Sequence, residues 1–170
     1  YRQVGDTGIV REHLTQAASA LHAVGDRRHL AMVHSLSGVT LAQEGRLDEA
    51  MSALSQAERL AVLVEAGDVL ATVCGNQANV ALMQHRHEQA LTLAERSVEL
   101  QEQGGTPHGL GVALASLGQI CVRLGSLNRA EEALNRALDV RSPLQFMRET
   151  TGAVFDTLAQ IHLIRGQHEE

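Results

Sequence analysis

Nine histidines and two cysteines are the residues of this chain whose types could support metal binding or nucleophilic catalysis. His85 and His87 stand two positions apart, and His162 and His168 stand six apart, so each pair could supply two metal ligands. A metal site needs three or four convergent ligands, and no carboxylate or thiol is spaced to complete one. We therefore expect no metal site and interpret His85 and His87 as polar residues of a surface turn. A His-dependent metal hydrolase stays the third functional hypothesis, which stoichiometric zinc on this pair would support.

The two cysteines, Cys74 and Cys121, are expected on the inward faces of helices, where a buried thiol behaves as a small hydrophobic side chain. Neither has a histidine or arginine at helical spacing that would lower its pKa, so we do not expect a catalytic cysteine. The glycine pair Gly104 and Gly105 is not followed by the Gly-Lys-Ser/Thr of a phosphate-binding loop. The sequence thus predicts neither an enzyme nor a bound cofactor.

Composition limits the classes of partner. The chain has 170 residues, of which 44% are hydrophobic and 2% aromatic, and its 14 basic residues, all arginine, face 20 acidic ones for a net charge of −6. An acidic chain with few aromatic side chains is not typical of nucleic-acid binding, so we expect no direct contact of this segment with nucleic acid. The longest apolar run, 60–64, is far shorter than the roughly 20 residues of a membrane span. We expect a cytoplasmic protein, and the lysine-free, alanine- and arginine-rich composition favours a bacterial source.

Elements that could position these residues follow from a recurrence of 40 residues. The segments 45–50, 85–90 and 125–130 align at this step, Gly5 lies 40 residues before Gly45, and Gly166 lies 41 after Gly125. On both sides of each turn, apolar residues recur at spacings of three and four, which is typical of amphipathic helices. Gly67, Gly104 and Pro143 mark a second break in successive units. The recurrence therefore predicts repeated helical hairpins and no β-strand.

The predicted fold class is an all-α solenoid of stacked antiparallel helix hairpins. The expected helices cover residues 1–4, 8–24, 28–44, 47–66, 69–84, 87–103, 108–124, 127–141 and 147–165. They group into a partial repeat (1–26), three repeats (27–66, 67–107 and 108–146) and a final partial repeat (147–170), in one array truncated at both ends. Each unit of such an array relies on its neighbours for burial, so we expect the parent protein to continue beyond both ends.

Small residues recur where two helices of a hairpin would cross. Ala50, Ala90 and Ala130 occupy one position in three copies. Gly38 and Gly118 occupy another, where the remaining copies have Ala78 and Ala159. Small side chains let helices approach closely, and Leu54, Leu117, Leu134 and Phe155 are expected to fill the grooves beside them. We interpret this alternation as a packing pattern and not as a catalytic one.

A known repeat family shows the same order of residues. The best copy contains Leu114, Leu117, Gly118, Cys121, Gly125, Leu127, Ala130, Leu134 and Ala137, and the copy before residue 66 contains Gly38, Leu41, Gly45, Leu47, Ala50, Leu54 and Ala57. At these residues the sequence resembles the tetratricopeptide repeat family. The 40-residue period is similar to a long-repeat group that includes kinesin light chains, Leu-Gly-Asn-rich adaptors and bacterial regulators of the maltose-regulator type. The resemblance implies a right-handed superhelix with the first helix of each hairpin on its concave side.

The resemblance also implies which side chains face the concave groove. They are Ser35, Val39 and Gln43, then Asn76, Asn79 and Met83, then Ser116, Gln119 and Arg123, then Asp156, Gln160 and Ile164. Asn79, Gln119 and Gln160 hold one equivalent place, so stacking would bring three amides into a row able to donate to and accept from a peptide backbone. The alternative is that these amides are merely solvated. Too few basic residues are present for the carboxylate clamp of chaperone-binding members, whereas Val39 and Met83 favour an amphipathic helix or an extended apolar segment.

Two functions compete on this evidence. The first is a scaffold that binds a protein or peptide ligand in the concave groove, as the docking or sensing region of a larger bacterial regulatory or signalling protein. The second is a self-association module that oligomerises its parent protein through exposed helix faces or ends. A groove binder should lose its ligand when Asn79 and Gln119 become alanine, whereas an assembly module should respond to substitutions at its ends.

Overall fold

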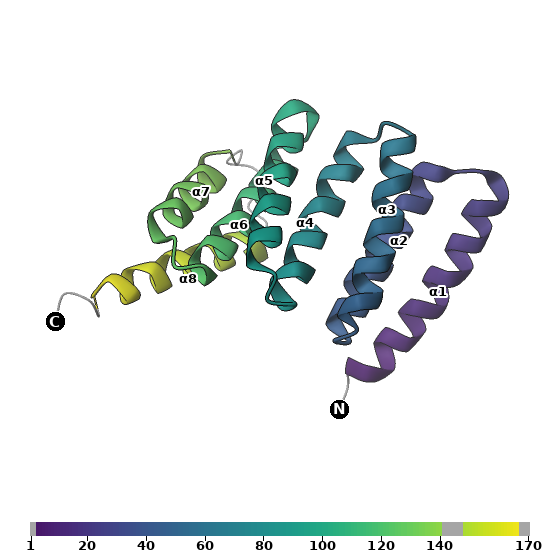
Figure 1. Ribbon diagram of the computed structural model, residues 1–170, viewed down its shortest axis with the longest axis horizontal. Helices are drawn as coiled ribbons and strands as arrows, with labels where there is room; N and C mark the ends of the chain where they lie inside the picture. Colours follow the sequence, from purple (N-terminus) through teal and green to yellow (C-terminus); the bar gives the residue numbers. More distant parts are fainter. Residues whose placement is uncertain (1–2, 141–147, 167–170) are drawn as a thin grey trace.

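Eight α-helices account for the architecture in the computed structural model, which describes residues 3–140 and 148–166 (Figure 1). They are α1 (Gln3–Val24), α2 (Arg27–Gln43), α3 (Leu47–Leu63), α4 (Gly67–Met83), α5 (His87–Gly104), α6 (Pro107–Arg123), α7 (Leu127–Asp139) and α8 (Arg148–Gly166). These ranges contain no strand. The helices follow one another along the long axis of the molecule, as Figure 1 shows. The predicted all-α solenoid is confirmed.

The even-numbered helices form the inner row of the array. Each helix from α1 to α7 contacts its successor. This includes α7 and α8, although the residues that connect them lie outside the described part. Backbone contacts additionally join α2 to α4, α4 to α6 and α6 to α8. Among the described helices, α3 and α5 make no such contact, and neither do α5 and α7. Rows that are closer together lie on the inside of a curved stack, so α2, α4, α6 and α8 line the concave side.

One turn geometry recurs between helices. A residue in the left-handed conformation follows five of them: Gly25, Gly45, Glu65, His85 and Gly125, with φ of 73°, 77°, 52°, 60° and 73°. At Gly45 the amide donates to the carbonyl of Ala42, and the next amide, of Arg46, donates to that of Leu41, both at 2.9 Å. This Schellman pattern satisfies carbonyls that the helix end leaves free, and the other four turns repeat it. The hairpin turns and the turns between hairpins are therefore alike.

The connection from α5 to α6 is built differently. Gly105 is extended, and the Thr106 hydroxyl accepts a hydrogen bond from the amide of Gly109 at 3.0 Å, which caps α6. Pro107 occupies the first turn, where its fixed φ suits a helix start and its missing N–H costs nothing. The break expected at Gly104 is confirmed, since α5 ends at Gly104 and α6 begins at Pro107.

Two boundaries differ from the sequence prediction. The expected turn at Gly5 and the separate helix 1–4 are wrong, because α1 runs unbroken from Gln3. Each of the other turns lies between two helices that pack against each other. No described helix precedes α1, so nothing in the described part would stabilise a break at Gly5. The break placed at Gly67 lies earlier, since α3 ends at Leu63, Glu65 takes the left-handed conformation, and Gly67 begins α4. The breaks expected at Pro143 and after Gly166 fall outside the described residues.

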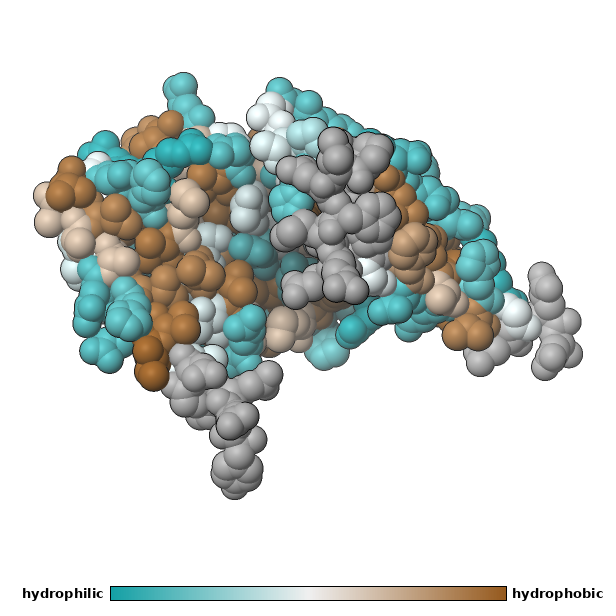
Figure 2. Space-filling model, turned by 180° about the vertical axis from the view of Figure 1, so that it is seen from behind, coloured by the Kyte–Doolittle hydropathy of each residue, from teal (hydrophilic) through white to brown (hydrophobic). Residues whose placement is uncertain are grey.

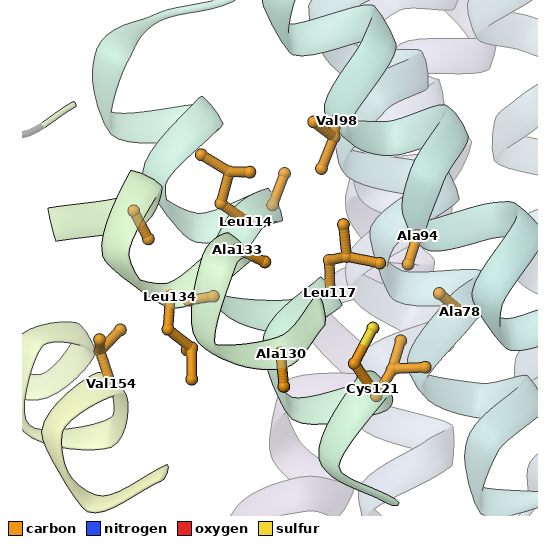
Figure 3. Close-up of a cluster of buried hydrophobic side chains, with 14 of the residues drawn as sticks. Ala78, Ala94, Val98, Leu114, Leu117, Cys121, Ala130, Ala133, Leu134 and Val154 are labelled. Atoms are coloured by element: carbon orange, nitrogen blue, oxygen red, sulfur yellow. The ribbon is translucent and has the colours of Figure 1, made fainter. Parts of the chain in front are cut away.

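Close helix crossings follow from the small residues. A Cβ built on Gly38 would lie 2.6 Å from Cγ of Leu54, and one on Gly118 would lie 2.6 Å from Cγ of Leu134. In the hairpin between them the same two positions hold Ala78 and Ala94, both buried. Figure 3 shows the cluster in which side chains of α4, α5, α6, α7 and α8 meet. The predicted packing of small against large residues is confirmed for Gly38 with Leu54 and for Gly118 with Leu134. It is wrong for Phe155, which was expected to fill a groove and is 54% exposed.

Candidate peptide-binding groove

The side chains assigned to the groove differ in exposure. Seven are exposed: Gln43, Asn79, Met83, Gln119, Arg123, Asp156 and Gln160. Val39, Asn76, Ser116 and Ile164 are half-buried. All lie on α2, α4, α6 and α8, the helices of the inner row. Whether they contact a ligand stays a prediction.

Ser35 is the exception, because it is only 5% exposed. Its hydroxyl accepts a hydrogen bond from Nδ2 of Asn76 at 3.0 Å, which links α2 to α4. The neighbouring Leu36 is 51% exposed and stands 40 residues before Asn76. The 40-residue step, applied strictly, assigns Leu36 and not Ser35 to the groove, and neither Leu36 nor Met32 was among the predicted groove residues.

A pocket of about 620 Å³ opens between α2 and α4, with Leu21 of α1 at its edge. We call it the N-terminal pocket. Its lining residues are Leu21, Arg28, His29, Met32, Val33, Ser35, Leu36, Val39, Asp68, Val69, Thr72 and Asn76. The surface in Figure 2, seen from behind Figure 1, has broad apolar areas over the N-terminal end of the array. Most of the accessible surface of this lining is apolar, and a concave, mainly apolar pocket is the form that binding sites commonly take.

The charges beside the N-terminal pocket are paired. Arg28 and Asp68 form an ion pair at 2.5 Å between α2 and α4. The ring Nδ1 of His29 lies 2.8 Å from a carboxylate oxygen of Asp26, whose other oxygen accepts from the His29 amide. These contacts neutralise the rim and leave the pocket without an uncompensated charge from its own lining.

The character of the inner surface changes from repeat to repeat. At three equivalent positions α2 has Met32, Leu36 and Val39, α4 has Thr72, Asn76 and Asn79, and α6 has Val112, Ser116 and Gln119. The first set is apolar, and the two that follow are mainly polar. The groove therefore combines an apolar end with a stretch that carries amides.

The amides of that stretch come from successive inner helices. Asn79, Gln119 and Gln160 lie exposed on α4, α6 and α8, and these helices contact one another in pairs. Each primary amide has two donors and an acceptor, which suits hydrogen bonding to peptide groups that are not already paired. Arg123, on α6, is an exposed cation in the same row of helices.

The residues considered for catalysis are arranged differently. Cys74 and Cys121 are buried as expected. Burial raises the pKa of the Cys74 thiol to about 11, and it also raises the pKa of Cys121, so neither is a ready thiolate near neutral pH. The ring of His85, in the exposed turn after α4, lies 6.1 Å from that of His87, the first residue of α5. No group of three potential metal ligands occurs within residues 3–140 and 148–166.

A buried amide was not foreseen from the sequence. Gln77, 3% exposed, stands where the next copy has Leu117, and its Nε2 donates to Glu58 at 2.9 Å. Arg96 donates to the other oxygen of the same carboxylate at 2.8 Å, while Oε1 of Gln77 has no partner. This network ties α3, α4 and α5 together away from the N-terminal pocket.

The helices of the described part include none that is long and apolar enough to cross a membrane.

Comparison with known proteins supports the same architecture. A family model described as tetratricopeptide repeat matches residues 69–142. No curated protein matches the sequence. The chain is similar to the crystal structure of BtubC (BKLC) from P. vanneervenii, with 18% identity and a TM-score of 0.64 over 95% of this chain and 78% of that one.

A second solved structure extends the likeness. The N-terminal domain of stress-induced protein-1 (STI-1) from C. elegans has 17% identity and a TM-score of 0.57, over 77% of this chain and 96% of that one. Identities this low show a shared fold and nothing about ligands. Residues 69–142 thus carry the sequence pattern of the tetratricopeptide repeat, within a chain whose fold is that of tetratricopeptide-like solenoids.

Proposed function

We propose that this chain is a protein-interaction scaffold whose inner helices bind a segment of a partner protein. Tetratricopeptide repeats generally mediate protein–protein interactions. The observation that carries the proposal is the N-terminal pocket of about 620 Å³ between the inner helices α2 and α4. Exposed amides on α4, α6 and α8, which contact one another in succession, add polar groups to the same row of helices. Solenoids use such concave surfaces to hold extended or helical ligands.

The parent of this segment is proposed to be a larger cytoplasmic regulatory or signalling protein of a bacterium, in the long-repeat group. The 40-residue period and the lysine-free composition support this. The net charge of −6 argues against a direct role for the segment in nucleic-acid binding. The docking or sensing role then belongs to the groove.

A selection from a displayed library of unbiased linear peptides tests the proposal. Selected peptides should bind the wild-type chain and lose about tenfold or more in affinity for Asn79→Ala/Gln119→Ala, because that variant removes two amides from the groove. Gln56→Ala/Gln103→Ala is the matched control, since both residues are exposed on the outer helices α3 and α5. Circular dichroism should show the same helix content for all three proteins. The proposal would be overturned by peptides whose affinity is unchanged both in Asn79→Ala/Gln119→Ala and in variants of the N-terminal pocket.

Self-association is the second candidate, and exposed apolar residues at the ends favour it. Phe155 and Leu163 on α8 are 54% and 68% exposed, and Ile9 on α1 is 58% exposed. Phe155 stands 41 residues after Leu114, which is fully buried. As an inner helix without a described outer one, α8 could pack on α1 of another copy as α6 packs on α7. In that case Phe155→Glu would abolish assembly in sedimentation equilibrium, whereas the amide variant would leave it unchanged.

A further inference from the structure

The N-terminal pocket contains an apolar ridge along a single helix. Met32, Leu36 and Val39 are spaced at i, i+4 and i+7 on α2, so they share one face over about 10 Å. Met32 and Leu36 are 49% and 51% exposed although both are large and apolar. Contiguous exposed apolar surface in a concave setting commonly marks an interaction site.

Stacking of the repeats does not require this ridge. The same positions hold Thr72, Asn76 and Asn79 on α4, a helix that is packed on both sides by its neighbours. Because polar residues serve there equally well, apolar ones at the first copy have a cause outside the fold itself. Binding of an apolar ligand is such a cause.

The polar groups around the ridge are already partnered. Arg28 pairs with Asp68, and Nδ2 of Asn76 donates to Ser35. The Thr72 hydroxyl donates to the backbone carbonyl of Asp68 at 3.1 Å. A charged group entering the pocket would lose its hydration without gaining an unpaired partner of opposite charge, which is costly. The occupant that fits is therefore uncharged where it enters.

The size of the pocket sets how many side chains must enter. A volume of about 620 Å³ is larger than any one amino-acid side chain occupies. An α-helix brings residues i, i+3 or i+4, and i+7 together on one face, and such a face packs into the groove between two neighbouring helices. An extended strand places side chains on one face only at every second residue and leaves its backbone groups to be paired.

We infer that the N-terminal pocket takes the apolar face of an amphipathic α-helix from a partner protein, with large uncharged side chains at i, i+4 and i+7. This inference rests on the proposed function and deepens it. The inner face then has two parts, an apolar anchor on α2 and α4 and an amide-bearing stretch beyond it.

A library of displayed peptides, helical by an alanine-, glutamate- and lysine-rich background and randomised at one face, provides the probe. Selection against the wild-type chain should enrich leucine, isoleucine, methionine or phenylalanine at i, i+4 and i+7. The decisive variant is Met32→Thr/Leu36→Asn, which gives the first repeat the residues that the second has at these positions. Fluorescence anisotropy should show a loss of affinity of about tenfold or more.

The control is Leu63→Asn, since Leu63 is 61% exposed on the outer helix α3, and its affinity should stay within about twofold of the wild type. The variants are compared at equal helix content by circular dichroism. Binders that need Asn79 and Gln119 but not Met32 and Leu36 would overturn this inference and leave the proposed function standing. Binders that need neither set would overturn both. A selection that yields no helical binder, or one rich in charged residues on the randomised face, also contradicts the inference.

Discussion

At the scale of single residues, His34 shows how one position in a repeat acquires a different property. It stands 40 residues before Cys74 and 80 before Leu114, both fully buried. Its imidazole is half-buried, and burial lowers its pKa below the usual value of about 6.5 because the charged form is desolvated. The unfolded chain therefore binds a proton more readily here than the folded one.

The sign of the resulting pH dependence is fixed by linkage. The contribution of neutral His34 is fully present above about pH 6.5 and is lost as the pH falls from there toward the lowered pKa of the folded state. We expect the melting temperature to drop between pH 7 and 5 and to drop less in His34→Leu, measured by differential scanning calorimetry. His13→Gln, at an exposed position, is the control and should follow the wild type.

Two carboxylates with lowered pKa values affect stability below this pH range. A backbone hydrogen bond from His29 lowers the pKa of Asp26, and a side-chain hydrogen bond from Arg46 lowers that of Glu49, so their contributions are lost in more acidic solution. Equal slopes for the wild type and His34→Leu between pH 7 and 5 would contradict the assignment.

Prediction from sequence succeeded unevenly at this scale. The burial of Cys74 and Cys121 followed from their place in the helical period. The exposed Leu36 was missed because one position of the first copy was aligned at 41 residues, and that single shift replaced it with the buried Ser35. The partners of Gln77 could not be foreseen, since Glu58 and Arg96 reach it from two other helices.

At the scale of elements, hairpin crossings combine one small and one large residue in a compensating way. Gly38 faces Leu54 and Gly118 faces Leu134, whereas the middle hairpin has alanine at both places. The space freed by the smaller partner on one helix is filled by the larger partner on the other. The pair should therefore be energetically coupled.

A double-mutant cycle measures that coupling. Gly118→Ala forces its Cβ against Leu134 and should cost about 1–3 kcal/mol, and Leu134→Ala should cost about 2–5 kcal/mol by leaving a cavity. The double variant reproduces the Ala78–Ala94 pair, so its loss in free energy of unfolding should be smaller than the sum by about 1 kcal/mol or more. Urea denaturation gives the values.

The control combines Gly118→Ala with Leu54→Ala in another hairpin, where the two effects should add within about 0.5 kcal/mol. Strict additivity of Gly118→Ala and Leu134→Ala would show that the close approach does not couple them.

Helix ends were predicted correctly at Gly25, Gly45, His85 and Gly125, whereas the glycine-marked breaks expected at Gly5 and Gly67 were wrong. Gly25, Gly45 and Gly125 take the left-handed conformation that glycine adopts at little cost. Glu65 and His85 take it as well, although their side chains disfavour it, because the Schellman hydrogen bonds and the packing of both flanking helices require the same turn. Such a requirement comes from the neighbouring helices and leaves no signal at the residue itself.

At the scale of the whole molecule, the 40-residue recurrence was enough to predict the stack of hairpins, since equal units that bury one another have few other arrangements. The N-terminal pocket was not predictable in the same way. The pocket depends on the volume left between α2 and α4 beside Leu21. A shift of either helix by less than the width of a side chain changes that volume, and the sequence pattern does not fix helix positions so accurately. The amides were placed on the inner helices by resemblance, and their role stays a prediction.

The buried apolar side chains are divided along the array. One cluster joins α4 to α8 and contains Leu134, while two smaller ones join α2, α3 and α4, and the second of these contains Leu54. In a chain of nearest-neighbour contacts, a local loss of packing should open the adjacent helices first. Stability is then expected to vary with position.

Leu54→Ala and Leu134→Ala test this as a matched pair, because both residues are fully buried at equivalent positions 80 residues apart. Each should destabilise its own hairpin by about 2–5 kcal/mol. Hydrogen exchange followed by mass spectrometry should show faster exchange in α2 and α3 for Leu54→Ala, with α6 to α8 nearly unchanged, and the opposite for Leu134→Ala. An equal acceleration in all eight helices for either variant would mean that the array unfolds as a single cooperative unit.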